Sequence, residues 1–164
     1  MARAVRCDVS RGAPRCARRS FRAALGITTR KWLRRVHPTT TWTTPVCTGA
    51  IYLAVAGLLD ALDATTHWAW AERLEELGAH YTGHRVVEQG KIITAAGVSS
   101  GIDMGLTLLD HLYGPVVAQS AQLGIEYDPQ PPFDAGSPTK APAEIVELVR
   151  PLLAPGGFVK ASPS

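Results

Sequence analysis

Residues 39–57 read TTTWTTPVCTGAIYLAVAG, and this stretch predicts a strand, a sharp turn and a helix in direct succession. Thr39–Val46 is short and rich in β-branched residues, which is typical of a strand. Ala50–Ala56 is apolar and is followed by Gly57, the residue type that most often ends a helix. Cys47 occupies the turn between them, where a side chain is exposed at the carboxyl end of the strand. This turn is therefore the first candidate for a functional site.

The rest of the chain alternates between the same two kinds of element. Its patterns predict helices at Thr66–Leu77, Ser100–Tyr113 and Pro115–Leu123, and a hairpin in which Arg85–Glu88 and Lys91–Ala95 flank Gln89-Gly90. On the Ser100–Tyr113 helix, Ile102, Leu106 and Leu109 are expected to share the inner face. Such alternation with short loops predicts an α/β sandwich with parallel strands.

Proline dominates the segment that follows. Asp128–Ala143 contains five prolines in sixteen residues, which predicts an extended arm on the surface. Ala143–Leu153 then has the periodicity of a final amphipathic helix, which Pro151 is expected to interrupt.

Charge divides the chain into two parts. Residues 1–35 hold eleven Lys and Arg against one acid, a net charge of +10, whereas residues 36–164 have a net charge of −7. Residues 1–31 lack a sustained period, so we interpret them as a disordered basic tail, although a transit peptide or a wrong start or reading frame would look similar. Because the acidic body repels phosphate, nucleic-acid binding is expected only through the tail.

Several classes of protein are disfavoured. The purely apolar run Ala50–Leu59 has ten residues, about half of what a membrane span requires. No apolar run follows the basic N-terminus, as a secretory signal would require. The three cysteines, Cys7, Cys16 and Cys47, form neither a closed disulfide framework nor a pair with zinc-site spacing, which favours a reducing cytoplasm.

The position of Cys47 indicates nucleophilic chemistry. Backbone N–H groups near such a turn can hold a developing oxyanion, and the field of the helix N-terminus favours the thiolate. The alternative is a buried structural cysteine, which is common.

From about Trp32 to Ala143 the chain resembles the ThiJ/PfpI superfamily, the class I glutamine amidotransferase-like proteins. The resemblance is carried, in this order, by TTPVCTGAIYLAVAGLLD, ATTHWAWAERLEELGA, RVVEQGKIITAAGVSSGIDMGLTLLDHLYG and QLGIEYDPQPPFDAGSP. The last segment is most similar to the stand-alone, isonitrile hydratase-like branch. The resemblance implies a flavodoxin-like three-layer α/β sandwich with a mostly parallel sheet.

The resemblance also implies roles for individual residues. Cys47 matches the family nucleophile, and Thr48 matches the next residue, whose N–H would help to hold the oxyanion. PfpI-type peptidases carry a histidine at that position, which argues against protease activity. His67 matches a position that the fold brings close to the nucleophile, although a structural histidine packed against Trp68 is an equal alternative.

A second group of residues is expected to border the substrate. These substrate-pocket candidates are Gly49, Ser99, Ser100 and Asp103. Asp103 lies in the first turn of a predicted helix, where an acid complements the helix dipole whatever the function. Glu126 and Asp128 are expected to anchor the Pro-rich arm. We predict no metal site, because the other histidines lack ligand spacing, and the resemblance implies no cofactor.

The chain also departs from the family pattern. Members begin with a strand that brings an acidic residue to the cysteine, and a Gly-Gly turn supplies a second oxyanion donor. Before Thr40 the sequence has only Asp8 as an acid and no Gly-Gly pair. We therefore expect a truncated or frame-disturbed domain, in which residues 32–164 form the C-terminal part. Pro45 removes a ladder donor, so the strand is expected to end before it.

These observations lead to one expected function and three alternatives. The resemblance implies a cysteine-dependent, cofactor-free hydratase or amidase-like enzyme that acts on a small molecule such as an isonitrile, impaired by truncation. It also implies a homodimer. The alternatives are a non-catalytic remnant, a redox sensor in which the Cys47 thiol is oxidised, and a protein that binds nucleic acid through its basic tail.

Overall fold

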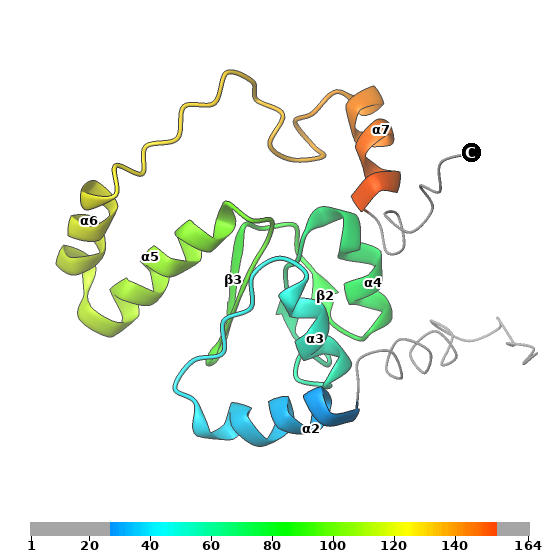
Figure 1. Ribbon diagram of the computed structural model, residues 1–164, viewed down its shortest axis with the longest axis vertical. Coiled ribbons are helices and arrows are strands. Elements are labelled where there is room, and N and C mark those ends of the chain that lie inside the picture. The colour runs from blue at the N-terminus through cyan, green and yellow to red at the C-terminus, as the bar shows by residue number, and fades with distance from the viewer. Residues whose placement is uncertain (1–26, 154–164) are drawn as a thin grey trace, which may run out of the picture.

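The computed structural model describes residues 27–153 (Figure 1). Its helices are α2 (Ile27–Val36), α3 (Gly49–Val55), α4 (Ala71–Glu76), α5 (Ser100–Tyr113), α6 (Pro115–Gly124) and α7 (Ala143–Leu153), with 3-10 turns η1 (His37–Thr39) and η2 (Trp68–Trp70). Its strands are β1 (Asp63–Ala64), β2 (His80–Tyr81), β3 (Val86–Gln89) and β4 (Ile92–Ala95). The α/β prediction is confirmed.

Helix α2 begins within the segment that the sequence predicts to be a disordered tail. Residues 27–31 were assigned to the tail, but they form the first half of α2, so the boundary at residue 31 is wrong. The helix is held because Leu33 packs on the core and the Arg34 Nε donates to the Ala56 carbonyl at 2.5 Å. Residues 1–26, which make up the rest of the predicted tail, lie outside the described residues.

The strands form a small layer with both parallel and antiparallel pairing. β1 pairs with β2 in parallel, and β3 pairs with β4 as an antiparallel hairpin, as predicted. Gln89 pairs with Ile92, so the turn is Gly90-Lys91 and not the predicted Gln89-Gly90, and Gly90 has a φ of 60° in it. Thr43 and Val46 form parallel bridges to Ile92 and Ala95 of β4. The segment before Cys47 therefore lies beside β4 and runs in the same direction.

Pro45 explains why Thr39–Val46 forms bridges instead of the continuous strand that was predicted. The Thr43 N–H donates to the Lys91 carbonyl at 2.9 Å, and the Ala95 N–H donates to the Pro45 carbonyl at 3.0 Å. A regular parallel ladder would also use an N–H at residue 45, which proline lacks. The pairing nevertheless continues to Cys47, so the expectation that the strand ends before Pro45 is wrong.

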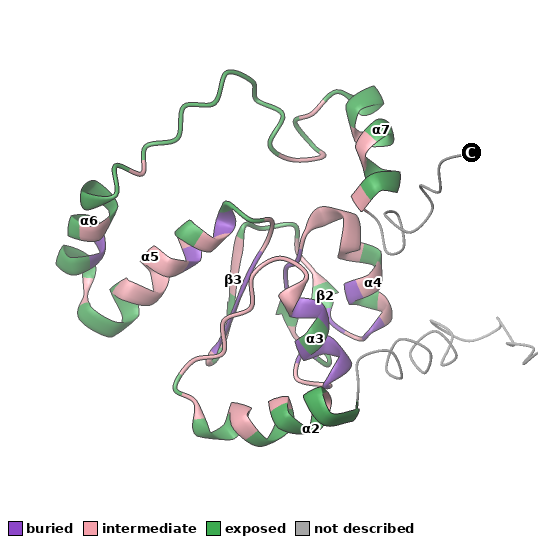
Figure 2. Ribbon diagram, viewed as in Figure 1, coloured by how far each residue is buried: buried purple, intermediate pink, exposed green. Residues whose placement is uncertain are grey.

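Two faces of β4 explain the layered architecture. Ile92 packs into the cluster built around α3 and α4, which includes Leu74. Ile93 points to the other side, into a cluster that includes Met104 of α5. Neighbouring strand residues alternate between faces, so one strand separates two helical layers. Figure 2 shows buried residues concentrated on α3, and every residue of β4 is buried as well, whereas α6 and α7 are mostly exposed.

The helices differ from the predictions in three places. Thr66–Leu77 is not one helix but η2 followed by α4. On α5, Met104 is buried and Ile102 is 40% exposed, whereas Leu106 and Leu109 of the predicted face are partly buried.

The final helix, α7, is the third difference. It continues through Pro151 to Leu153, contrary to the predicted interruption. Glu147 on this helix is exposed, so water can satisfy the carbonyl that Pro151 leaves without a donor. Across residues 27–153, no helix has the length and hydropathy that crossing a membrane requires.

The core predicts a sharp contrast between two leucines. Leu74→Ala is expected to lower the free energy of unfolding by about 2–5 kcal/mol, because Leu74 is fully buried against α3. Leu148→Ala, at a position that is 66% exposed on α7, is the matched control and is expected to change it by about 0.5 kcal/mol or less. Urea denaturation measures both variants, and equal losses would contradict this description of the core.

Candidate functional site

Cys47 lies in a strained backbone conformation between the β4-paired segment and α3. Its φ angle is 57°, and it is one of three non-glycine residues with positive φ within residues 27–153. Such a conformation costs a non-glycine residue about 1–2 kcal/mol and persists only where the surroundings enforce it. A Cβ at Gly49 would meet the Pro45 Cβ at 3.3 Å, so a residue without a side chain lets the helix begin this close to the strand.

Three hydrogen bonds fix the backbone of Cys47 and leave its thiol uncommitted. The Cys47 N–H donates to the Ala95 carbonyl at 3.0 Å. The Cys47 carbonyl accepts from the Thr66 hydroxyl at 2.9 Å and from the Ala50 N–H at 3.3 Å. Within the described part of the chain the thiol is free of disulfide and hydrogen bonds, and the residue is partly exposed. The sequence did not single out Thr66 as a residue of the site, although it directly precedes the candidate residue His67.

The residue after Cys47 offers a backbone donor. Among residues 27–153, the N–H groups of Gly49 and Ala50 donate to the carbonyls of Val46 and Cys47, whereas no hydrogen bond uses the N–H of Thr48. The Thr48 side chain makes no capping bond to α3. A developing negative charge next to the Cys47 thiol can therefore be met by this N–H.

His67 follows Thr66 directly, so its backbone is held next to that of Cys47. Its Nδ1 accepts a hydrogen bond from the Ala69 N–H at 3.3 Å, which assigns the ring proton to Nε2. The ring is partly buried beside Trp68, with a centroid separation of 5.6 Å, and burial lowers the pKa of His67. A Cβ at Gly97 would lie 3.4 Å from the His67 Cδ2, so His67 also borders the loop that leads into α5.

The substrate-pocket candidates on α5 fall into two groups. Ser100 is buried with its hydroxyl unpaired among the described residues, and the adjacent Gly101 faces Val46 so closely that a Cβ there would be 3.4 Å from its side chain. Ser99 is exposed and joins Asp103 in a separate network. The structure therefore brings the first turn of α5, at Gly101, to the element that precedes Cys47, whereas the Asp103 carboxylate is engaged by Arg85 and Tyr127.

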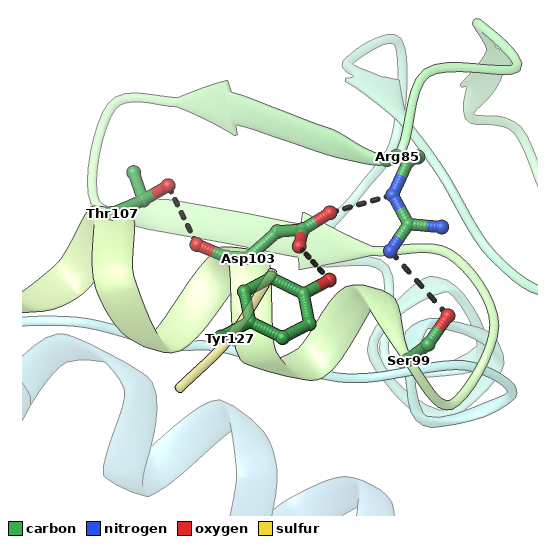
Figure 3. A network of polar contacts seen from close by, with 5 residues as sticks. All are labelled: Arg85, Ser99, Asp103, Thr107 and Tyr127. Carbon is green, nitrogen blue, oxygen red and sulfur yellow. Dashed lines mark hydrogen bonds and ion pairs between the residues drawn. The ribbon is translucent and has the colours of Figure 1, made fainter. Parts of the chain in front are cut away.

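Asp103 is the centre of that network (Figure 3). Its carboxylate accepts hydrogen bonds from the Arg85 Nε at 2.5 Å and from the Tyr127 hydroxyl at 2.6 Å. Burial alone would raise the pKa of Asp103, but the hydrogen bonds from Arg85 and Tyr127 outweigh it and lower that pKa. The Arg85 guanidinium also reaches the Ser99 hydroxyl at 3.4 Å.

This network, rather than Glu126 or Asp128, anchors the start of the Pro-rich arm. Tyr127 lies between those two acids and makes the contact with α5, whereas Asp128 accepts only from Gln130 among the described side chains. The sequence reading missed both Arg85 and Tyr127, because their partner is distant in sequence.

The strain at Cys47 predicts an unusual order of stabilities. Cys47→Gly is expected to be more stable than Cys47→Ala by about 1 kcal/mol, because only glycine adopts a φ of 57° without a steric penalty. Urea denaturation of both variants measures the difference. At an ordinary backbone position the alanine variant is the more stable of the two, and that result would contradict backbone strain at Cys47.

Burial of His67 predicts a dependence of stability on pH. The unfolded chain binds the His67 proton near pH 6.5 and the folded chain only at lower pH, so the free energy of unfolding falls as pH is lowered through this window. His37, whose pKa burial and Lys91 also lower, adds to the same trend. His67→Gln is expected to make the decline between about pH 7 and pH 5 shallower. Parallel curves for the variant and the parent chain, measured by urea denaturation, would contradict this.

Comparisons with known proteins agree with this geometry. Residues 22–111 match the model of the DJ-1/PfpI family. The chain is 47% identical over 114 residues to an isonitrile hydratase of Pseudomonas putida, which covers 70% of this chain and 50% of the relative. It is 33% identical over 93 residues to the HTH-type transcriptional regulator CdhR of Pseudomonas aeruginosa, which covers 54% of this chain and 27% of the regulator.

Solved structures give the same result. A THiJ/PfpI family protein from Pseudomonas syringae has a TM-score of 0.62 and 45% identity, over 66% of this chain and 46% of that protein. DJ-1beta of Drosophila melanogaster shares the fold, with a TM-score of 0.57 at 19% identity, over 67% of this chain and 60% of its own. The chain thus spans half the length, or less, of the curated relatives that it matches. The family match, together with the turn at Cys47 and the layered α/β fold, shows that the chain belongs to the DJ-1/PfpI family.

Proposed function

We propose that this protein is a cysteine-dependent enzyme that hydrates a small isonitrile to an N-substituted formamide. The observation that carries the proposal is the strained turn at Cys47, which presents an uncommitted thiol next to the unused N–H of Thr48. The 47% identity to an isonitrile hydratase supports this substrate class over other substrates of cysteine nucleophiles.

The proposed reaction consumes one water and needs no oxidant or cofactor. The Cys47 thiolate attacks the terminal carbon of R–N≡C, and that carbon takes up a proton, which gives the thioimidate Cys47–S–CH=N–R. Water adds across the C=N bond, with its hydroxyl on carbon and its proton on nitrogen. Loss of the thiolate and of the hydroxyl proton releases R–NH–CHO and regenerates the enzyme.

Thr48 and His67 are proposed to assist these steps. The Thr48 N–H is placed to stabilise negative charge as the tetrahedral adduct forms, and its hydroxyl to orient the water. His67 carries its proton on Nε2, so the neutral ring would donate a hydrogen bond to the substrate nitrogen as negative charge develops there, and would keep its proton throughout. Its lowered pKa keeps the ring in this neutral form at neutral pH.

The remaining candidates are proposed to support the site instead of reacting. Gly49 lets helix and strand approach, and Ser100 supports the segment that precedes Cys47. Ser99 and Asp103 are proposed to position the arm through Arg85 and Tyr127.

We further propose a cytoplasmic homodimer. The cytoplasmic assignment rests on the unpaired thiol of Cys47. The dimer rests on the family resemblance and on exposed apolar side chains of α5 and α6 such as Tyr113 and Val116.

A specific observation supports binding of nucleic acid as a second candidate function. Lys31 and Arg35 are exposed on α2, and none of the ion pairs between described residues includes either of them. Loss of binding to single-stranded DNA in the double variant Lys31→Ala, Arg35→Ala, with a shallower salt dependence than the parent chain, would support this function.

Turnover of a simple alkyl isonitrile tests the proposed enzyme. Cys47→Ser is expected to abolish formation of the N-alkylformamide, and His67→Ala to lower kcat by about 10²–10³-fold, the usual effect of losing a donor that stabilises developing charge. His84→Ala, which replaces an exposed histidine, is the matched control and should keep the parent activity. The formamide is quantified by mass spectrometry, with Thr48→Ala expected to lose less than His67→Ala because the backbone N–H remains.

Two outcomes would contradict the proposal. If Cys47→Ser produces the formamide at the parent rate, Cys47 is not the nucleophile. An inactive parent chain in which Cys47 is oxidised reversibly by peroxide would favour the thiol sensor instead.

A further inference from the structure

A cavity of about 120 Å³ lies between η2, the Pro-rich arm and α7. Trp68, Pro138, Ala141, Ile145, Val146 and Val149 form most of its lining. We propose that this cavity holds the hydrocarbon substituent of the substrate, so that it selects isonitriles by the size of their R group. This proposal rests on the proposed function, because it assigns the substrate's reactive carbon to Cys47.

The first argument is the position of the cavity relative to Cys47. Thr66 donates to the Cys47 carbonyl at 2.9 Å, His67 follows, and Trp68 is the next residue and a wall of the cavity. Three consecutive residues therefore lead from the backbone of Cys47 to the cavity. In the proposed complex the substrate carbon meets the Cys47 thiol and the R group extends past His67 toward Trp68.

The second argument is that the walls are held in place. The Trp70 indole N–H donates to the Leu153 carbonyl at 2.8 Å, which ties the end of α7 to η2. The Arg150 guanidinium lies 5.1 Å from the centre of the Trp68 ring. Figure 1 shows the arm running from α6 to α7.

The arm side of the cavity is held by its own backbone. The N–H groups of Lys140 and Ala141 both donate to the Ser137 carbonyl, at 3.1 and 2.9 Å. The Lys140 ammonium forms an ion pair with Asp134 at 2.7 Å, so its charge is engaged on the arm. A cavity with fixed walls on both sides can discriminate by size, since its volume does not adapt freely to the occupant.

The third argument is the chemistry of the lining. Ser137 is the polar member of the lining residues, and none of them is charged. The pocket is partly open to solvent, and a hydrocarbon group gains by leaving water for these apolar side chains. A dry cavity of about 150 Å³ accepts benzene, so a volume of about 120 Å³ suits a group of roughly four to six carbon atoms.

The test measures binding without turnover. N-alkylformamides with chains from methyl to octyl are titrated into the full chain carrying Cys47→Ser, and binding is followed by calorimetry. While successive methylenes enter the cavity, affinity is expected to rise by about fourfold for each one, and then to level off when the cavity is full.

Variants that fill the cavity supply the decisive comparison. Val149→Phe and, separately, Ala141→Leu are expected to shorten the alkyl chain length at which affinity stops rising. Leu148→Phe, at the neighbouring exposed position on α7, is the matched control and should leave the series unchanged. Circular dichroism checks that each variant is folded.

The outcomes separate this proposal from the proposed function. If affinity depends on chain length in the same way in the parent, Val149→Phe and Ala141→Leu proteins, the cavity is not the binding site. If none of the formamides binds, the proposal is overturned as well. If isonitriles of different chain lengths are turned over at equal rates, the proposed enzyme is supported, but this cavity is not the site that binds the R group. A series that shifts as expected in a chain without turnover would support the cavity and contradict the enzyme.

Discussion

Ala95 and Thr66 together hold the backbone of Cys47, and the site depends on this pair of contacts. Ala95 of β4 donates to the Pro45 carbonyl and accepts from the Cys47 N–H, which keeps the paired segment beside the strand up to the turn. Thr66 binds the Cys47 carbonyl from the other side. With both backbone groups of Cys47 bonded, a φ of 57° persists despite its steric cost. The strain is the observation on which the proposed role of the Cys47 side chain rests.

The same contacts organise the surroundings of the thiol. Because Thr66 is fixed, His67 and Trp68 follow in a defined path, with His67 bound to the Ala69 N–H and packed near Gly97. On the other side of the sheet, the link between Arg85, Asp103 and Tyr127 anchors the start of the arm. The arm then reaches α7, whose end is tied to Trp70. One chain of contacts thus connects the strained turn to the cavity beside Trp68.

Local patterns in the sequence predicted the parts that depend on local physics. The bounds of α5 follow from periodicity and were predicted. The β3–β4 hairpin was predicted too, but its turn is one residue further along the chain than expected, because Gln89 pairs with Ile92. The position of Cys47 between a paired segment and a helix was predicted in the same way. Pairing past Pro45 was not, because it depends on which carbonyls β4 offers. The partners of Asp103 were also missed, since Arg85 and Tyr127 meet it only through tertiary contacts.

Alkylation of the three cysteines tests the central claim that the turn presents a reactive thiol. Limiting iodoacetamide at neutral pH, followed by peptide mapping, compares Cys47 with Cys7 and Cys16 in the folded chain and in urea. The account predicts that Cys47 is labelled fastest in the folded chain and loses this advantage in urea, where the turn no longer exists. Labelling of Cys47 that is slower in the folded chain than in urea would identify it as a protected structural cysteine and contradict the account.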